Sequence, residues 1–297
     1  MPPPSRRLRT VALLSAGLVL AVAAIGYLTG GSRHAAPEPP PPGCQAGSGV
    51  AALPLDTSQA AIAATIAGVA ARHGLGKQAV TIAYATALQE SKLQNLDYGD
   101  RDSVGVFQQR PSQGWGTATE LLDPVYASTK FFAALVEVHG YASMPVSQAA
   151  QDVQHSAGGY AYEQWAETAS LLAGYFTGAS PAGVSCWYTP SGKADLTGAI
   201  KQLTSTFGPS GAHDVLTKVS TTRTASGDQK DQATSVAVVH VQAKAGWTVA
   251  GWLVAHAQQY GLSQVRYAGY AWNAANGSGG WHRATSQQPA SQSIVAG

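Results

Sequence analysis

Charged residues are scarce in this chain of 297 residues. Lys, Arg, Asp and Glu make up 11% of it and leave a formal net charge of +2, whereas an average soluble domain has about 25% charged residues. No basic run with interleaved aromatic residues occurs, so the sequence does not predict nucleic-acid binding. Gly, Ala, Ser, Thr and Gln are abundant instead, a composition that fits an exported globular protein.

Cysteine is rarer still, with only Cys44 and Cys186 in the chain. The pair brackets the stretch that reads as the first folded domain, so one disulfide tying its two edges is the favoured interpretation and two free thiols are the alternative. His240, His256 and His282 each stand alone, without the three or four ligands that a zinc site needs. We therefore expect no metal and no cofactor.

The N-terminal segment predicts membrane targeting. Three arginines within the first nine residues precede an uncharged apolar run from Thr10 to about Gly30. The run has the roughly 20 residues that span a bilayer, exceeds the 7–15-residue core of a cleavable signal, and follows arginines that favour a cytoplasmic N-terminus. We predict a signal-anchor transmembrane helix over 1–30 and a single-pass cell-membrane protein with an extracytoplasmic C-terminal part. The alternative is a cleaved signal and a secreted protein.

Composition and periodicity divide the rest of the chain into segments. Residues 31–52 contain the run PEPPPP and predict a stiff Pro-rich linker. Residues 53–178 read as helices, without a period-2 pattern of useful length. A Pro-, Gly- and Ser-rich linker at 179–194 leads to a small non-catalytic α/β module at 195–284, and we expect a disordered tail at 285–297. The predicted fold class is thus an N-terminal transmembrane helix, a mainly α domain and a small C-terminal α/β domain.

One stretch carries a motif with chemical meaning. Residues 85–116 read ATALQESKLQNLDYGDRDSVGVFQQRPSQGWG, in which Glu90-Ser91 precedes Gly-Val-Phe-Gln-Gln at 105–109. This order resembles the active-site core of the lysozyme-like lytic transglycosylases, specifically over residues 86–116 and loosely over 53–178. The resemblance implies an actinobacterial membrane-anchored wall protein with a lysozyme-like domain, in which Glu90 is the general acid that cleaves peptidoglycan glycan strands.

The helical pattern around Glu90 supports that role independently. Ala79, Ala83, Ala87 and Glu90 share one face of the expected helix at spacings of four, four and three. A carboxyl at the edge of a buried stripe is partly desolvated, which raises its pKa. A raised pKa lets a general acid keep its proton near neutral pH. The alternative is an ordinary surface glutamate in the last turn of a helix.

Three aspartates follow in the loop, at positions 97, 100 and 102. Ordinary glycosidases pair the acid with a second carboxylate, and one of these could serve. A calcium loop of the EF-hand type would need a glutamate at its twelfth position, and none is there. Side chains that cap backbone groups in turns are the favoured interpretation.

Several side chains are candidates for binding a neutral glycan. Glutamine amides both donate and accept hydrogen bonds, and tryptophan can stack on a sugar. The Asn-Ala-Gly usual in the family is not reproduced, and Gln154, Tyr160 and Tyr162 stand in that region. The predicted substrate-binding residues are Ser91, Gln108, Gln109, Trp115, Gln154, Tyr160 and Tyr162.

The leading functional hypothesis is a glycan-cleaving enzyme of the lytic transglycosylase or muramidase type. Its partners would be peptidoglycan glycan strands and, through the N-terminal helix, the membrane. The alternative is a non-catalytic peptidoglycan-binding or scaffold protein that retains the fold. Charge differs between the modules: six Lys/Arg stand against eleven Asp/Glu in 53–178, and eight against four from Cys186 onward. Ordinary variation of the surface is the favoured explanation of this charge difference. The alternative is that the basic C-terminal part binds anionic wall polymers.

Overall fold

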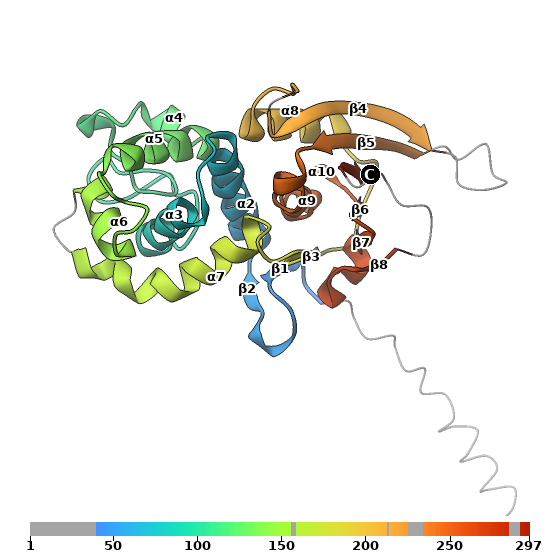
Figure 1. The fold of residues 1–297 in the computed structure, drawn as a ribbon, viewed down its shortest axis with the longest axis horizontal. Helices are drawn as coiled ribbons and strands as arrows, with labels where there is room; N and C mark the ends of the chain where they lie inside the picture. The colour runs from blue at the N-terminus through green and yellow to red at the C-terminus, as the bar shows by residue number, and fades with distance from the viewer. Residues whose placement is uncertain (1–39, 156–158, 213, 225–233, 285–291) are drawn as a thin grey trace, which may run out of the picture. The chain divides into compact units, whose positions relative to one another are not determined.

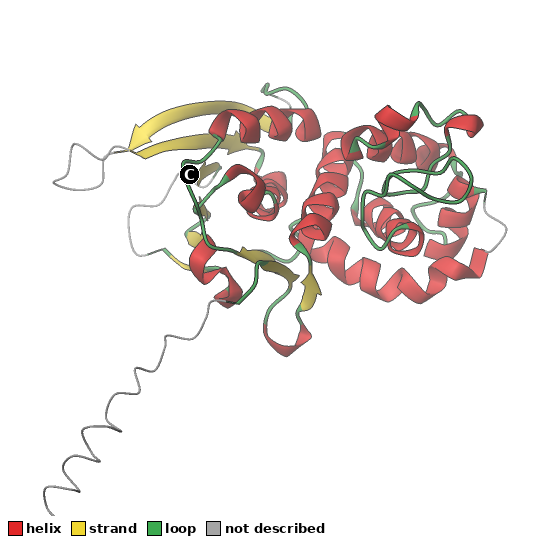
Figure 2. Cartoon of the chain, turned by 180° about the vertical axis from the view of Figure 1, so that it is seen from behind, coloured by secondary structure: helices red, strands yellow, loops and turns green. Residues whose placement is uncertain are grey.

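The computed structural model describes residues 40–155, 159–212, 214–224, 234–284 and 292–297. Its elements belong to the unit of residues 41–297, and Figures 1 and 2 show the strands confined to one half of it. The helices of the other half are α2 (Thr57–Arg72), α3 (Lys77–Glu90), α4 (Ala118–Leu121), α5 (Pro124–Glu137), α6 (Val146–Gln154) and α7 (Ala166–Phe176). Two short 3₁₀ segments, η2 (Pro111–Gln113) and η3 (Gly159–Trp165), lie between these helices, and a third, η1 (Gly49–Ala51), precedes them.

Helix α2 is buried along nearly its whole length. Asp56 and Gln59 cap its start, where the Asp56 amide donates to the Gln59 side chain at 2.9 Å, and Gly74 ends it with φ of +67°. Helices α3 and α5 pack on one side of it, and α8 (Leu196–Phe207) and α9 (Gly246–Ala255) pack on another. A helix that is apolar all round is one that is buried all round.

A small antiparallel sheet joins the two ends of the helical half. Its strands are β1 (Gly43–Ala46), β2 (Leu53–Leu55) and β3 (Val184–Trp187), in the order β2-β1-β3. Cys44 lies directly opposite Cys186 in this ladder, and the two form a disulfide. The segments expected to be linkers at 31–52 and 179–194 therefore contain paired strands.

The second sheet has six antiparallel strands in the order β4-β5-β9-β6-β7-β8. They are β4 (Leu216–Thr224), β5 (Thr234–Val241), β6 (Gln264–Tyr267), β7 (Tyr270–Asn273), β8 (His282–Arg283) and β9 (Ser293–Ala296), with η4 (Ala243–Ala245), α10 (Ala257–Tyr260) and η5 (Ala274–Gly279) between them. Strand β9 pairs with both β5 and β6. The expected disordered tail thus places buried residues inside the sheet.

The predicted fold class is wrong. The part of the chain that the structure describes is not a mainly α domain with a small module attached, because it contains two antiparallel sheets, one of six strands. Moreover, α8 and α9 pack on α2, so one hydrophobic core runs through both halves. The predicted transmembrane helix at 1–30 falls outside the described residues. Among the residues that are described, no helix is long and apolar enough to cross a membrane.

The disulfide gives a first testable prediction. The cysteines are separated by 142 residues, and closing so long a loop restricts the unfolded chain, worth up to about 4–5 kcal/mol in the chain-entropy model. We expect Cys44→Ser to lower the thermal midpoint strongly, and Cys44→Ser/Cys186→Ser to do so to a similar extent. Calorimetry of both variants measures this effect. Two alkylatable thiols in the unreduced wild-type protein, detected by mass spectrometry, would contradict the prediction.

Candidate active site around Glu90

Glu90 is the last residue of α3 and lies where that helix leaves the core. The helix is buried from Ala79 to Leu88, and its alanines allow α6, α7 and η3 to pack closely around it. The exposure changes over the last turn, where Gln89 and Glu90 are half-buried. The helix therefore holds this carboxylate at the edge of the core.

Two polar side chains from later elements hold the Glu90 carboxylate. The Tyr162 hydroxyl, on η3, donates to Glu90 Oε1 at 2.8 Å. The Gln154 amide, at the end of α6, also hydrogen-bonds Glu90, and its Nε2 donates to the Phe107 carbonyl at 2.8 Å. The structure thus brings together three of the residues that the sequence proposes for one site.

Burial raises the pKa of Glu90 above the ordinary value of a glutamate, because a desolvated carboxylate loses its hydration. The hydrogen bonds from Tyr162 and Gln154, and the positive charge of Lys92, act in the opposite direction and stabilise the ionised form. Desolvation is the largest of these effects. Glu90 therefore keeps its proton to higher pH than an exposed glutamate does.

Ser91 connects the 105–109 loop to the C-terminal end of α3 through hydrogen bonds. It is buried, and its hydroxyl lies 2.7 Å from the Val106 carbonyl and 3.1 Å from the Ala87 carbonyl. The loop is closed by paired backbone hydrogen bonds between Val104 and Gln109. The Glu-Ser and Gly-Val-Phe-Gln-Gln motifs are therefore parts of one local structure, in which Ser91 faces the loop backbone.

Phe107 fills the space behind this loop, where it is buried and stacks on Phe131 with 4.4 Å between ring centroids. Gln109 is 2% exposed, and its Nε2 lies 3.4 Å from the Ala127 carbonyl. Gln108 is half-buried and donates to the Tyr98 and Gly105 carbonyls, each at 3.2 Å. The two glutamines thus form hydrogen bonds within the loop and with α5.

The remaining predicted contact residues differ in exposure. Trp115 is half-buried and packs against the core. Tyr160 is 93% exposed, two residues before Tyr162 on η3. It borders a cavity of about 580 Å³ whose other walls come from Pro145 and the first turns of α6. Helix α6 and segment η3 therefore supply the partners of Glu90 and also border this cavity, which neither Glu90 nor those partners line.

Sequence reasoning missed a second set of contacts beside Glu90. The Trp165 indole donates to Gln89 Oε1 at 2.9 Å, and Gln164 Nε2 donates to the same oxygen at 3.1 Å. The Lys92 ammonium lies 4.3 Å from the centre of a Trp165 ring. These contacts anchor η3 to the end of α3. No spacing rule predicts them, because they join residues more than seventy positions apart.

The three loop aspartates do not contribute to the pKa of Glu90. Asp102 accepts from Arg110 Nε at 2.9 Å and from the Ser112 amide at 2.7 Å, and these bonds hold the pKa of its carboxyl well below the usual range. Asp102 therefore stabilises the loop by accepting hydrogen bonds from its backbone and side chains, as a turn-capping residue does. No group of metal-binding side chains occurs among the residues that the structure describes.

The three C-terminal histidines also have local partners or face solvent. His256 is buried and stacks on Trp252 at 3.9 Å, and burial lowers its pKa to about 4. His240 Nδ1 lies 2.8 Å from the Ser293 hydroxyl, and His282 is exposed.

No protein-family model matches the chain, and none of the curated proteins matches it either. The case for function therefore rests on the geometry around Glu90.

Gly105 provides a test of how the loop is built. Its φ is +78°, and a Cβ there would lie 2.3 Å from the Leu121 carbonyl oxygen. We expect Gly105→Ala to lower the free energy of unfolding by at least about 1–3 kcal/mol. Gly114→Ala is the matched control, because Gly114 has φ of +81° but open space around it. Urea unfolding compares the two variants, and equal losses would contradict a steric role for Gly105.

Proposed function

We propose that this protein cleaves the glycan strand of peptidoglycan, with Glu90 as the general acid. The observation that carries the proposal is the half-buried carboxyl of Glu90, with a raised pKa and hydrogen bonds from Tyr162 and Gln154. A carboxyl whose pKa is raised by burial and that has specific hydrogen-bond partners is a candidate catalytic group. The exposed Tyr160 ring, two residues from Tyr162, is available to stack on a sugar.

The proposed reaction uses a single carboxylic acid. Protonated Glu90 donates its proton to the glycosidic oxygen as the bond from that oxygen to the sugar carbon breaks. A hydroxyl of the same sugar then attacks that carbon and returns its proton to Glu90, which gives an anhydro product. Tyr162 and Gln154 stabilise the carboxylate between the two proton transfers. Asp102, one candidate for the second carboxylate of a two-carboxylate hydrolysis, is instead bonded to Arg110 and Ser112, which favours the single-acid route.

The compartment follows from the same proposal. Peptidoglycan lies outside the cytoplasm, and the disulfide between Cys44 and Cys186 is of the kind that persists in oxidising compartments. We therefore place the described part of the chain on the extracytoplasmic side.

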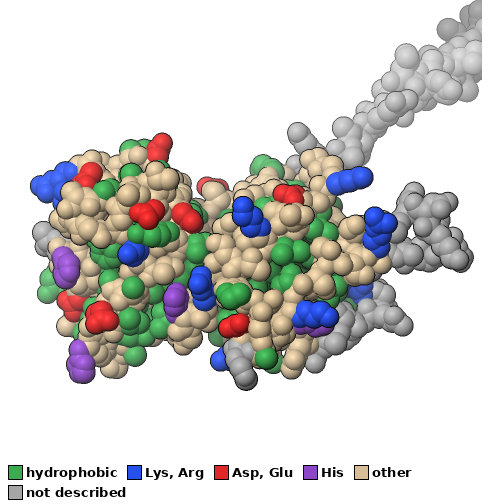
Figure 3. All heavy atoms as spheres, turned by 90° about the horizontal axis from the view of Figure 1, so that it is seen from above, with side chains coloured by type: hydrophobic (Ala, Val, Ile, Leu, Met, Phe, Trp, Pro, Cys, Tyr) green, Lys and Arg blue, Asp and Glu red, His purple; other side chains and the backbone are tan. Residues whose placement is uncertain are grey.

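Anionic wall polymers are a further candidate partner. On the face seen in Figure 3, acidic side chains are more frequent over the helical half and basic ones over the half with the six-stranded sheet. A basic face attracts polyanions at low ionic strength. This attraction would hold the protein near its substrate without taking part in the chemistry.

Removal of the acid tests the proposal directly. Glu90→Gln should lower the release of anhydro-muropeptides from purified sacculi by about 10²–10⁴-fold, the contribution of a positioned general acid. Glu137→Gln is the matched control, because Glu137 also ends a helix but is exposed, and it should behave like the wild type. Mass spectrometry of the released fragments measures both. Wild-type protein that binds sacculi and releases nothing would instead establish a non-catalytic binding protein.

The pH dependence tests the role of Tyr162. Activity should fall as pH rises through the pKa of Glu90, because the acid must be protonated. The Tyr162 hydroxyl stabilises the ionised carboxylate and so lowers that pKa. Tyr162→Phe should therefore raise the pKa and move the decline in rate to higher pH. Tyr98→Phe, at an exposed tyrosine outside the site, should leave the profile in place. A shift of the Tyr162→Phe profile to lower pH would refute this assignment.

A further inference from the structure

A second cavity, of about 390 Å³, lies away from Glu90 between the two halves of the fold. Its floor comes from the end of α2, the start of α3 and the connection that leaves α7, and its far wall comes from η4 and the first turn of α9. The volume is within the range of small-molecule sites, about 300–1,000 Å³. The cavity is therefore large enough for a small organic ligand.

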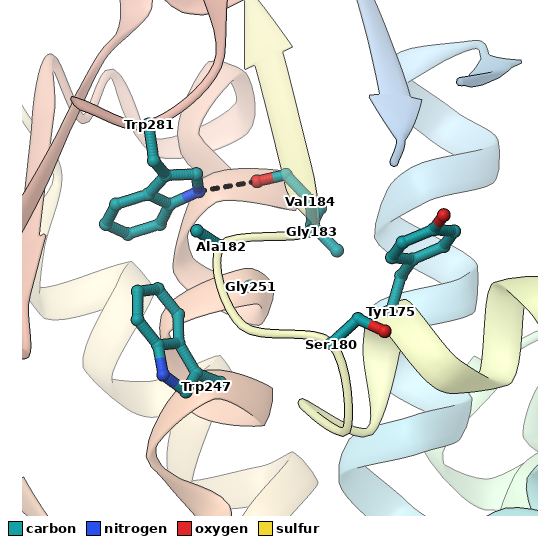
Figure 4. A pocket seen from close by; sticks show the side chains of 8 residues that line it. All are labelled: Tyr175, Ser180, Ala182, Gly183, Val184, Trp247, Gly251 and Trp281. Atoms are coloured by element: carbon teal, nitrogen blue, oxygen red, sulfur yellow. Dashed lines mark hydrogen bonds between the residues drawn. The ribbon is translucent and has the colours of Figure 1, made fainter. Parts of the chain in front are cut away.

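A neighbouring hollow is tightly packed, so the 390 Å³ cavity does not reflect loose packing throughout this region. The connection from α7 to β3 also borders a hollow between Tyr175, Trp247 and Trp281 (Figure 4). That hollow has no room for a water molecule, and the Trp281 indole donates to the Val184 carbonyl across it at 2.8 Å. The same connection thus packs tightly on one side and leaves an open cavity on the other.

The charged residues that line the cavity are both lysines. Lys77 and Lys244 line it, no Asp or Glu does, and neither lysine forms an ion pair with any of the described residues. Lys77 is the first residue of α3, and Lys244 lies in η4 just before α9. Neither helix has a side-chain cap at its N-terminus. A cation at the positive end of a helix dipole is unfavourable, so an anion between these groups would relieve both.

Thr248 is an independent indication of a ligand. It is 5% exposed and lines the cavity from the first turn of α9, and its hydroxyl forms no hydrogen bond with any residue that the structure describes. The oxygen is not sealed off from solvent, so it can form a hydrogen bond with water or with a ligand. Its position in the cavity wall gives it access to a ligand that accepts hydrogen bonds.

The rest of the lining is apolar and comes from Ala67, Ala71, Leu75, Val80 and Val215. This wall suits a short hydrocarbon group, while the lysines, the helix ends and Thr248 suit a phosphate. We propose that the cavity binds a phosphomonoester that carries a short apolar group, with the phosphate between Lys77, Lys244 and Thr248.

Isothermal titration calorimetry of the full chain with hexyl phosphate tests the proposal. Binding should be at least about tenfold tighter than that of inorganic phosphate or hexanol, because only hexyl phosphate fills both parts of the cavity. Added salt should weaken it. Equal affinities for hexyl phosphate and inorganic phosphate, or no heat of binding at all, would overturn the proposal.

Variants localise the binding. Lys77→Gln and Lys244→Gln should each weaken hexyl phosphate binding about tenfold, and Thr248→Val about threefold. Lys201→Gln is the matched control, because Lys201 is an exposed lysine on α8 outside the cavity. If Lys201→Gln weakens hexyl phosphate binding equally, the attraction is nonspecific and the proposal is wrong. The lysines are exposed, so their variants keep the test valid if Thr248→Val does not fold.

The phosphate could belong to a soluble ester or to a lipid headgroup, and vesicles distinguish the two. Co-sedimentation with vesicles that contain phosphatidic acid, lost in Lys77→Gln and Lys244→Gln but not in Lys201→Gln, would support the lipid. Absence of co-sedimentation with retained hexyl phosphate binding would support the soluble ester. Neither result depends on Glu90, so both stand apart from the proposed glycan cleavage.

Discussion

The packing of α2 between the two halves is the constraint on which the rest of the structure depends. The helix has small residues where its neighbours approach: a Cβ added to Gly68 would lie 2.5 Å from the Thr206 side chain on α8. Tyr84, on α3, reaches it from the other half and donates to the Ala63 carbonyl at 2.7 Å. Because one helix serves both halves, its burial makes a single core, and removal of either half would expose an apolar surface of α2 to water.

The local parts of the site were predictable from the sequence, and their assembly was predictable only in part. The alanine spacing predicts a helix that carries Glu90, although not that it ends there, and the resemblance in motif order implies that Glu90 lies close to the 105–109 loop. The bond from Ser91 to the Val106 carbonyl explains that proximity physically. The partnership with Tyr162 depends on how η3 turns back over α3, and no local pattern encodes that turn.

The errors in the predicted fold have a common physical origin. Strands of three or four residues, such as β1 and β3, are too short to show a period-2 pattern, and a proline-rich composition before β1 favoured a linker. Strand β9 was missed for the same reason. Helix α2 was identified as a helix, but an alanine-rich surface does not reveal that two different partners cover it. The sequence indicates which helix faces are buried but not which elements cover them, so it does not reveal the core that both halves share.

The disulfide has a mechanical consequence. It joins β1 to β3 across a loop that contains the whole helical half, including Glu90 and its partners. A force that pulls the chain between a point before Cys44 and a point after Cys186 passes directly through the sulfur atoms. The residues between them carry none of this tension and cannot be extended by it. Stretching would therefore extend the six-stranded sheet first, while the residues around Glu90 stay inside the covalent loop.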